Sequence, residues 1–457
     1  MAHDITFLLL ANSCYWLAGS GVLRTLGGRR SGRDLPARVG LAYVLGVATI
    51  GVAGQLLLVL GAALTIPEVV GLSALFYLIG FLRRPTPYEP GPLATARAAR
   101  VIPLVVGFLL CVLMVMLVFE PLGSWDAWGF WTPKAESIVI FHGLNHYYFT
   151  APTTFNPEYP LLLPTIEAIG FRFMGSFDTQ VIHLQFGLLL TGFVLALVAL
   201  LRQRVSAQFL WMSLALVVAA PLVWSQSASA YADVPLGIFF ALAAISAYLW
   251  IETDDRFARN IAVVFASAAL ATKLEGRLYV GVLVVVVASL AFAGSRRQVF
   301  TVCAGALLSS IGIVPWLLWT HHYGIKDPYS FRPERLSEEL HRAPATVAHL
   351  AANALSPRYW LFLPVAVLIL SVAALTTKTS RRVGGYVLTV TAISLIGLVW
   401  AYLNSPYPFH WQLETSSYRV VIPLVLFWGA ALPLLADATI PGSQPSVWPS
   451  PAVRGSS

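Results

Sequence analysis

The chain has 457 residues, of which 58% are hydrophobic and only 11% are charged, and its mean hydropathy is +0.75. Soluble globular proteins carry about 25% charged residues, so these values exclude a soluble enzyme, a secreted disulfide-rich domain, a coiled coil and a disordered regulator. A transmembrane β-barrel is also excluded, because its strands alternate polar and apolar residues. We therefore predict an all-α fold, a polytopic bundle of transmembrane helices.

Thirteen stretches approach the length of a transmembrane helix, which is about 20 apolar residues. In chain order they are Ile5–Leu23, Val39–Leu60, Pro67–Leu82, Val101–Phe119, Val181–Leu201, Gln208–Val223, Val234–Ile251, Ile261–Thr272, Arg277–Ala293, Val299–Trp319, Tyr359–Leu375, Tyr386–Tyr402 and Tyr418–Leu435. The apolar stretch Leu161–Met174 is shorter and is accompanied by Pro160, Pro164 and Arg172, so we predict a helix at the membrane interface there.

The basic residues predict an orientation, because Lys and Arg gather in short cytoplasmic loops. With the N-terminus outside and the C-terminus in the cytoplasm, 19 of the 29 Lys and Arg residues fall on the cytoplasmic side and every cytoplasmic connection is basic. Fifteen of the 21 acidic residues then fall outside. The net charge of +8 is thus explained largely by orientation in the cell membrane, and no nucleic-acid partner is expected.

The predicted outer face carries the long loops, which are rich in Trp, Tyr, His and Pro. Loops of this length are usually functional or disordered, and this composition is not typical of disorder. We divide the chain into four N-terminal spans at 1–119, a core at 120–435 and a disordered cytoplasmic tail at 436–457. The core contains the outer loops 120–180, 320–358 and 403–417.

Asp126 is the first candidate for chemistry in these loops. It follows a predicted span and is surrounded by Trp125, Trp128, Phe130 and Trp131, side chains that suit a membrane interface. Burial among aromatic rings would raise the pKa of this carboxyl group and make it a workable general base. A solvated loop carboxylate beside an aromatic belt is the alternative interpretation.

Two further segments place acidic residues at the outer face. In the segment NPEYPLLLP at 156–164, prolines restrict the backbone and would present Glu158 and Tyr159 rigidly, although a purely structural turn explains the segment equally well. Asp233 lies where an outer loop re-enters the membrane. Because a carboxylate followed by a nearby proline is also typical of a helix start, capping remains open for Asp233.

Cations accompany these acids. Lys273, Glu275 and Arg277 lie between two apolar runs, where charges are costly unless they pair or line a wet cavity. An ion network that only stabilises a hairpin is the alternative. His410 and Arg419 precede the last span, and an arginine there either extends to the interface or binds a lipid phosphate.

Five stretches, taken in order, carry a resemblance. They are SWDAWGFWTPKAESI at 124–138, NPEYPLLLP at 156–164, SASAYADVPLGIFFALAA at 227–244, ATKLEGRLY at 271–279 and, more loosely, HWQLETSSYR at 410–419. The ordered set resembles the GT-C class of polyprenyl-phosphate-sugar-dependent membrane glycosyltransferases, especially bacterial relatives of protein O-mannosyltransferases and of lipid A aminoarabinose transferases. It differs in having four predicted spans before Asp126, and Ala127 where a second acid would stand.

The resemblance implies that Asp126 is the catalytic base and that Arg419 binds the lipid phosphate. It also implies that Asp233 is a second acid of the site and that Lys273 and Glu275 form a charged turn beside the donor pocket. The predicted substrate-binding residues are Trp125, Lys134, Glu158, Tyr159, Asp233, Lys273, Glu275, Arg277, His410 and Arg419. No metal ligand is predicted, although His142 and His146 could face one ion if they were helical, and a divalent metal remains open.

These expectations describe an inverting glycosyltransferase of the cell envelope, with a polyprenyl-phosphate-linked sugar as donor. The acceptor hydroxyl belongs to an unidentified glycan, lipid or protein at the outer face, and membrane lipid surrounds the protein. Two alternatives remain. One is a transporter or lipid flippase, in which Asp233, Lys273 and Glu275 form an intramembrane path. The other is a catalytically inactive subunit of the same class.

Overall fold

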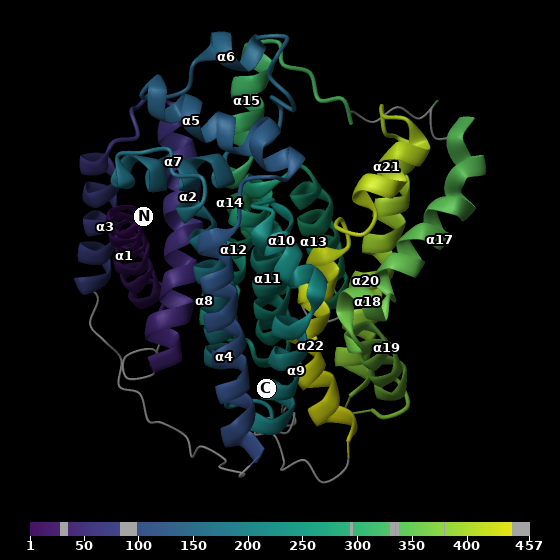
Figure 1. The fold of residues 1–457 in the computed structure, drawn as a ribbon. Helices are drawn as coiled ribbons and strands as arrows, with labels where there is room; N and C mark the ends of the chain where they lie inside the picture. Colours follow the sequence, from purple (N-terminus) through teal and green to yellow (C-terminus); the bar gives the residue numbers. More distant parts are fainter. Residues whose placement is uncertain are drawn as a thin grey trace.

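The protein is described by a computed structural model that covers residues 1–27, 35–82, 98–292, 296–329, 334, 338–378 and 380–440. Within these ranges the regular structure is entirely helical, which confirms the predicted fold class. Most of the long helices run side by side in one bundle, and short helices cover one end of it (Figure 1).

The first 272 residues contain twelve of the numbered α-helices among the described residues. They are α1 (Ala2–Thr25), α2 (Ala42–Val59), α3 (Ile66–Phe81), α4 (Ala98–Phe119), α5 (Thr132–Ile140), α6 (His146–Thr150), α7 (Leu162–Met174), α8 (Leu184–Leu201), α9 (Ala207–Ala219), α10 (Pro221–Ala228), α11 (Asp233–Thr253) and α12 (Arg256–Thr272). A π-helical turn at Ala127–Trp131 leads directly into α5.

The rest of the chain continues the bundle. Its described helices are α13 (Glu275–Phe292), α14 (Arg296–Ser309), α15 (Val314–His322), α17 (Ala343–Ala354), α18 (Pro357–Trp360), α19 (Leu363–Ala374), α20 (Arg381–Leu403), α21 (Phe409–Ser416) and α22 (Ile422–Thr439). Of the predicted cytoplasmic tail, residues 436–439 still belong to α22, and residues 441–457 lie outside the described part of the chain.

The structure supports fewer straight spans than the thirteen predicted. Among the described residues, eight helices are long and apolar enough to cross a membrane, namely α1, α2, α4, α8, α11, α13, α20 and α22. Counting each bent helix pair as one span raises the number to 11. The remaining two predicted spans correspond to α3, with 16 residues, and α12, with 17.

Three of the predicted spans are broken by bends. The bend is 53° between α9 and α10, 47° before α15, and 115° before α19. Pro221, Pro315 and Pro364 lie at the first or second position of the helix that follows each break. Because proline lacks a backbone N–H and its ring clashes with the preceding turn, it starts a new helix more readily than it continues one.

The connections that the charge pattern assigns to one side lie together at one end of the bundle. Arg204 after α8 forms an ion pair with Asp255 before α12 at 3.2 Å, and Ser206 donates its backbone N–H to Asp437 in α22 at 3.0 Å. Asn260 donates to the carbonyl of Leu26 after α1 at 3.4 Å. The opposite end carries α6, α15 and α21 (Figure 1), and the segment before α5 and the turn after α21 lie toward it.

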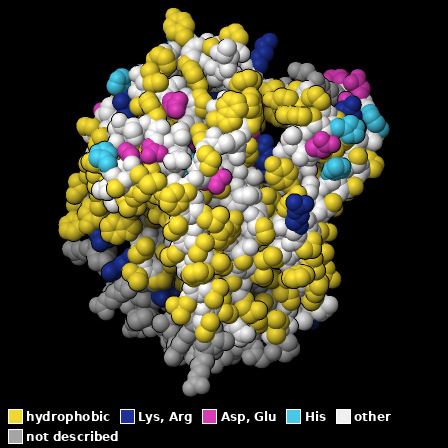
Figure 2. All heavy atoms as spheres, viewed as in Figure 1, with side chains coloured by type: hydrophobic (Ala, Val, Ile, Leu, Met, Phe, Trp, Pro, Cys, Tyr) yellow, Lys and Arg dark blue, Asp and Glu magenta, His cyan; other side chains and the backbone are white. Residues whose placement is uncertain are grey.

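The surface between the two ends is apolar. Figure 2 shows hydrophobic side chains over the middle of the visible face, whereas Asp, Glu and His side chains gather toward the end that carries α6 and α21. Leu104, Phe108 and Val115 of α4 are 61–73% exposed. Leucine and phenylalanine side chains exposed on this scale are costly in water but are solvated in a lipid bilayer, so the chain is a multi-pass membrane protein.

Helix α7, the stretch predicted to lie at the membrane interface, is covered by other parts of the protein. It has 13 residues, and Arg172 is the one residue of this helix whose side chain is not buried. Its neighbours are α1, α2 and α5. The sequence alone could not distinguish these partners from lipid, because both offer an apolar surface.

The first helices pack closely against one another and against the rest of the bundle. A side chain at Gly46 in α2 would place its Cβ atom 1.7 Å from the carbonyl oxygen of Tyr15 in α1, so only glycine permits this approach. Helix α2 also contacts α7, α12 and α15. Whether residues 1–119 form a functionally separate module stays a prediction, but their second helix lies within the interior of the bundle.

Candidate functional site

Five of the predicted residues meet in one cluster of charged side chains. We refer to Asp126, Asp233, Lys273, Glu275 and Arg419 as the charge network. They come from four separate segments: the π-helical turn before α5, the start of α11, the turn between α12 and α13, and the turn between α21 and α22. The sequence predicted each of these residues for the site, and the structure brings them together.

The network is a chain of alternating charges. Arg419 forms an ion pair with Asp126 through Nη1, and the same nitrogen lies 3.7 Å from Oδ2 of Asp233. Lys273 binds the other oxygen of Asp233 at 2.8 Å, and its ammonium also lies 3.1 Å from Oε1 of Glu275. Three carboxylates therefore share two cations, which leaves the network with one excess negative charge if all five groups are ionised.

The network is shielded from solvent. Asp126, Asp233 and Lys273 are 8%, 2% and 3% exposed. Burial alone would lower the pKa of Lys273, but the carboxylates of Asp233 and Glu275 outweigh this effect and raise the pKa above its ordinary value. Lys273 is therefore a permanent cation, and oxygens of Asp233 (Oδ2) and Glu275 (Oε2) remain buried without a hydrogen-bond partner.

Local structure explains how each side chain reaches the network. Asp126 directly precedes the π-helical turn, a geometry that often occurs at functional sites. Asp233 begins α11, and Lys273 ends α12 in an extended conformation. Residues 417–421 form a turn, so the last span starts at Ile422 and not at the predicted Tyr418. Arg419 consequently lies in a turn and points into the protein.

Tyr231 belongs to the site although the sequence prediction missed it. Its hydroxyl accepts a hydrogen bond from the backbone N–H of Asp126 at 3.3 Å, and its ring lies 4.8 Å from the guanidinium carbon of Arg419. Burial raises the pKa of this hydroxyl group. The sequence did offer a signal for Tyr231, because this residue stands two positions before Asp233 in the segment 227–244 that carries part of the resemblance.

A second group of predicted residues surrounds Lys134, which is fully buried. Its ammonium donates to the backbone carbonyl of Asn156 and lies 5.7–6.0 Å from four aromatic rings. Burial lowers the pKa of Lys134 to about 7, and Glu158 partly opposes the shift. Burial also raises the pKa of Glu158. Lys134 thus holds the backbone at Asn156, and its side chain faces protein on all sides.

Tyr159 connects the two groups. Its ring is 5.6 Å from that of Phe130 and 5.5 Å from that of Trp131, and burial raises the pKa of its hydroxyl well above the ordinary value. Asp126, Glu158 and Glu275 all lie near enough to contribute to that rise. Tyr159 therefore stands between the charge network and the segment that Lys134 holds.

Three predicted residues lie apart from the network. Arg277 forms an ion pair with Asp327 at 2.7 Å, a partner that the sequence did not suggest. Trp125 is half exposed and packs on Trp128 with ring centroids 4.4 Å apart. His410 is exposed on α21, next to the ring of Phe409.

The histidine pair offers no shared metal geometry. His142 precedes α6 with a positive φ of 56°, and its ring nitrogen lies 2.9 Å from the guanidinium of Arg172. His146 begins α6 and stacks on Tyr323 at 5.0 Å. In the described ranges, no group of three or more His, Cys, Asp and Glu side chains is arranged to hold a metal ion.

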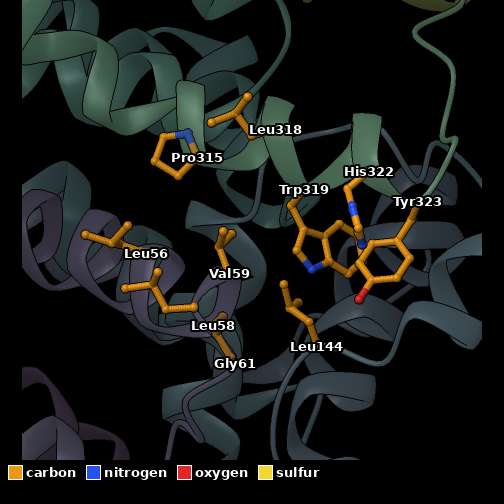
Figure 3. A pocket seen from close by; sticks show the side chains of 11 residues that line it. Leu56, Leu58, Val59, Gly61, Leu144, Pro315, Leu318, Trp319, His322 and Tyr323 are labelled. Atoms are coloured by element: carbon orange, nitrogen blue, oxygen red, sulfur yellow. The ribbon is translucent and has the colours of Figure 1, made fainter.

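An apolar pocket of about 580 Å³ lies at the same end of the bundle. Its walls come from the end of α2, from Leu144 and from α15, and Figure 3 shows Trp319, His322 and Tyr323 on the opposite side from Leu56 and Leu58. None of its lining residues is acidic, Lys or Arg. It therefore offers no Lys or Arg side chain to a phosphate, unlike the charge network.

The network can perform two kinds of chemistry. A carboxylate beside a guanidinium can accept a proton once an anion competes for the guanidinium, and two adjacent cations can stabilise a leaving phosphate. Figure 2 shows the surface hollowed between the part over α5 and α6 and the part over α17 and α21, with a Lys or Arg side chain visible inside.

No protein-family model, curated protein or solved structure matches the chain.

Proposed function

We propose that the protein is an integral membrane glycosyltransferase that moves a sugar from a polyprenyl-phosphate donor to an acceptor hydroxyl. The observation that carries the proposal is the convergence of Asp126, Asp233, Lys273, Glu275 and Arg419 into one buried network near one end of the bundle. The proposed orientation puts that end, with the N-terminus, on the extracytoplasmic face and the C-terminus in the cytoplasm.

The proposed reaction is a single displacement. The acceptor oxygen attacks the anomeric carbon, the bond from that carbon to the phosphate oxygen breaks, and Asp126 takes the hydroxyl proton. The configuration at the anomeric carbon is inverted, and polyprenyl phosphate leaves with the bonding electron pair. Arg419 and Lys273 stabilise its negative charge, whereas Arg277 is paired with Asp327.

The ion pairs couple donor binding to the base. Arg419 is bound to Oδ2 of Asp126 in the structure. When a phosphate binds to Arg419, it competes with Asp126 for the guanidinium. Donor binding would thus change the partner of the proposed base.

The transporter alternative receives less support. Lys273 and Glu275 lie at the turn between α12 and α13, Arg419 lies in the turn before α22, and Asp126 lies outside every candidate span. An intramembrane path for ions would instead place such charges midway along the spans. The positions of these residues at helix ends favour a reaction at the membrane surface.

The test uses the full chain in lipid nanodiscs with a panel of radiolabelled polyprenyl-phosphate pentoses and hexoses. Release of polyprenyl phosphate is measured for the wild type, Asp126→Asn and Asp255→Asn, since Asp255 forms a more exposed ion pair with Arg204 at the other end. We expect turnover by the wild type and Asp255→Asn, and at least a hundredfold loss for Asp126→Asn. Equal turnover in all three would refute the role of Asp126, and no turnover with any donor would refute the function.

A further inference from the structure

A buried glutamine in α2 joins two distant parts of the chain. Gln55 is 1% exposed, and its Oε1 accepts a hydrogen bond from the backbone N–H of Leu161 at 2.8 Å. Its Nε2 donates to the backbone carbonyl of Gly312, also at 2.8 Å. One partner is a donor and the other an acceptor, so the amide of Gln55 satisfies both in a single orientation.

Both backbone groups lie where helices begin or break. Gly312 stands at the 47° bend before α15, and Leu161 directly precedes α7. Such groups lack partners within a helix, and a buried backbone group without a partner is costly. Gln55 therefore stabilises the bend and the start of α7 together.

The segment that Gln55 holds is the one that carries Glu158 and Tyr159. We refer to residues 156–161 as the proline turn. Trp316 of α15 donates to the carbonyl of Glu158 at 2.8 Å, and Tyr407 donates to the side chain of Asn156 at 3.2 Å. With Lys134 at the carbonyl of Asn156, four side chains from distant parts of the chain fix this turn.

We infer that Gln55 is a positioning residue for the proposed transfer reaction, because it holds the proline turn, and with it Tyr159, beside the charge network. This inference rests on the proposed function. It makes α2 part of the catalytic unit, although α2 contributes no residue to the charge network.

The test compares two buried glutamines. Gln55→Met keeps the length of the side chain but removes both hydrogen bonds. Gln185→Met is the matched control, since Gln185 is 3% exposed and donates to Tyr43 at 2.8 Å, away from the proline turn. Trp316→Phe is a second variant, because it removes the bond to Glu158 from the other side of the turn.

Two measurements are made in nanodiscs. Hydrogen–deuterium exchange reports on the turn without any need for activity, and the amide of Tyr159, which donates to the carbonyl of Asn156 at 3.1 Å, is the most informative position. We expect at least tenfold faster exchange there in Gln55→Met and Trp316→Phe, and no change in Gln185→Met. In the transfer assay we expect the KM for the donor to rise about tenfold in the first two variants alone.

The outcomes separate the two claims. Unchanged exchange in the proline turn of Gln55→Met overturns the inference directly. Faster exchange with the same KM and kcat as Gln185→Met also overturns it, because the residue is then structural only. No turnover by the wild type with any donor overturns the proposed function and the positioning role with it, and the exchange data still show whether Gln55 holds the turn.

Discussion

The ion pair between Arg419 and Asp126 yields the sharpest prediction about stability. Arg419→Gln removes the cation that Asp126 shares with Asp233. Asp233 keeps Lys273 at 2.8 Å, but Asp126 loses its one ion-pair partner among the described residues. Its carboxylate would be buried and uncompensated, so the change acts mainly through this single group.

The magnitude follows from burial. Because the side chains of Arg419 and Asp126 are only 13% and 12% exposed, loss of the cation should cost about 3–5 kcal/mol. Asp126→Asn should cost about 1–3 kcal/mol, since an amide oxygen still accepts from the guanidinium. The double variant leaves no lone charge at position 126, so its cost should fall short of the sum by about 1.5–3 kcal/mol.

The assay is a double-mutant cycle on thermal unfolding in detergent micelles, followed by tryptophan fluorescence. The same cycle on Arg204→Gln and Asp255→Asn is the control, because those side chains are 17% and 29% exposed and their coupling should remain below about 1 kcal/mol. Additive losses at Arg419 and Asp126, with a coupling below about 0.5 kcal/mol, would refute the buried pair.

Two further predictions concern stability alone. Burial raises the pKa of Glu167 in α7 to about 8. The folded state therefore keeps a proton that the unfolded chain loses above about pH 4.5. The stability of the protein should consequently fall as pH rises from about 4.5 to 8. Glu167→Gln should remove this loss of stability, which is about 3 kcal/mol at pH 7, so the variant should have a higher Tm at pH 7 but not at pH 4.5. Equal gains in Tm at both pH values would contradict a protonated Glu167 in the folded state. Gly46→Ala should destabilise the protein by about 1–3 kcal/mol or more, because its Cβ atom would meet the carbonyl oxygen of Tyr15. Gly71→Ala in α3 is the control, because its Cβ atom would meet no atom within 4 Å, and it should leave Tm unchanged or slightly higher. Equal losses of stability in the two glycine variants would refute the close approach of α1 and α2.

The sequence predicted the helical fold because apolar length and charge position are properties of single segments. Each predicted span is helical over most of its length, but the breaks were missed although prolines marked them. A proline at the start of a helix and a proline inside a helix look alike in sequence. Only the packed structure shows that Pro221 and Pro315 begin new helices after bends of 53° and 47°.

The members of the charge network were predictable, but their pairing was not. Charged residues at the ends of apolar runs are rare enough to be noticed singly. Pairing depends on which helix ends lie together, and this requires the tertiary fold. The buried state of Lys134 escaped prediction for the same reason, because one of the rings around it belongs to Phe149 and another to Tyr159.

The separation between Asp126 and Arg419 along the chain has a consequence for how the protein is made. The two residues are 293 positions apart, and Arg419 directly precedes the final helix α22. During synthesis, Asp126 enters its surroundings long before its arginine partner exists, whereas Asp233 meets Lys273 only 40 positions later. The unfinished chain must therefore keep the carboxylate of Asp126 hydrated. A ribosome that stops before residue 419 would release a protein with most of its helices and no complete charge network.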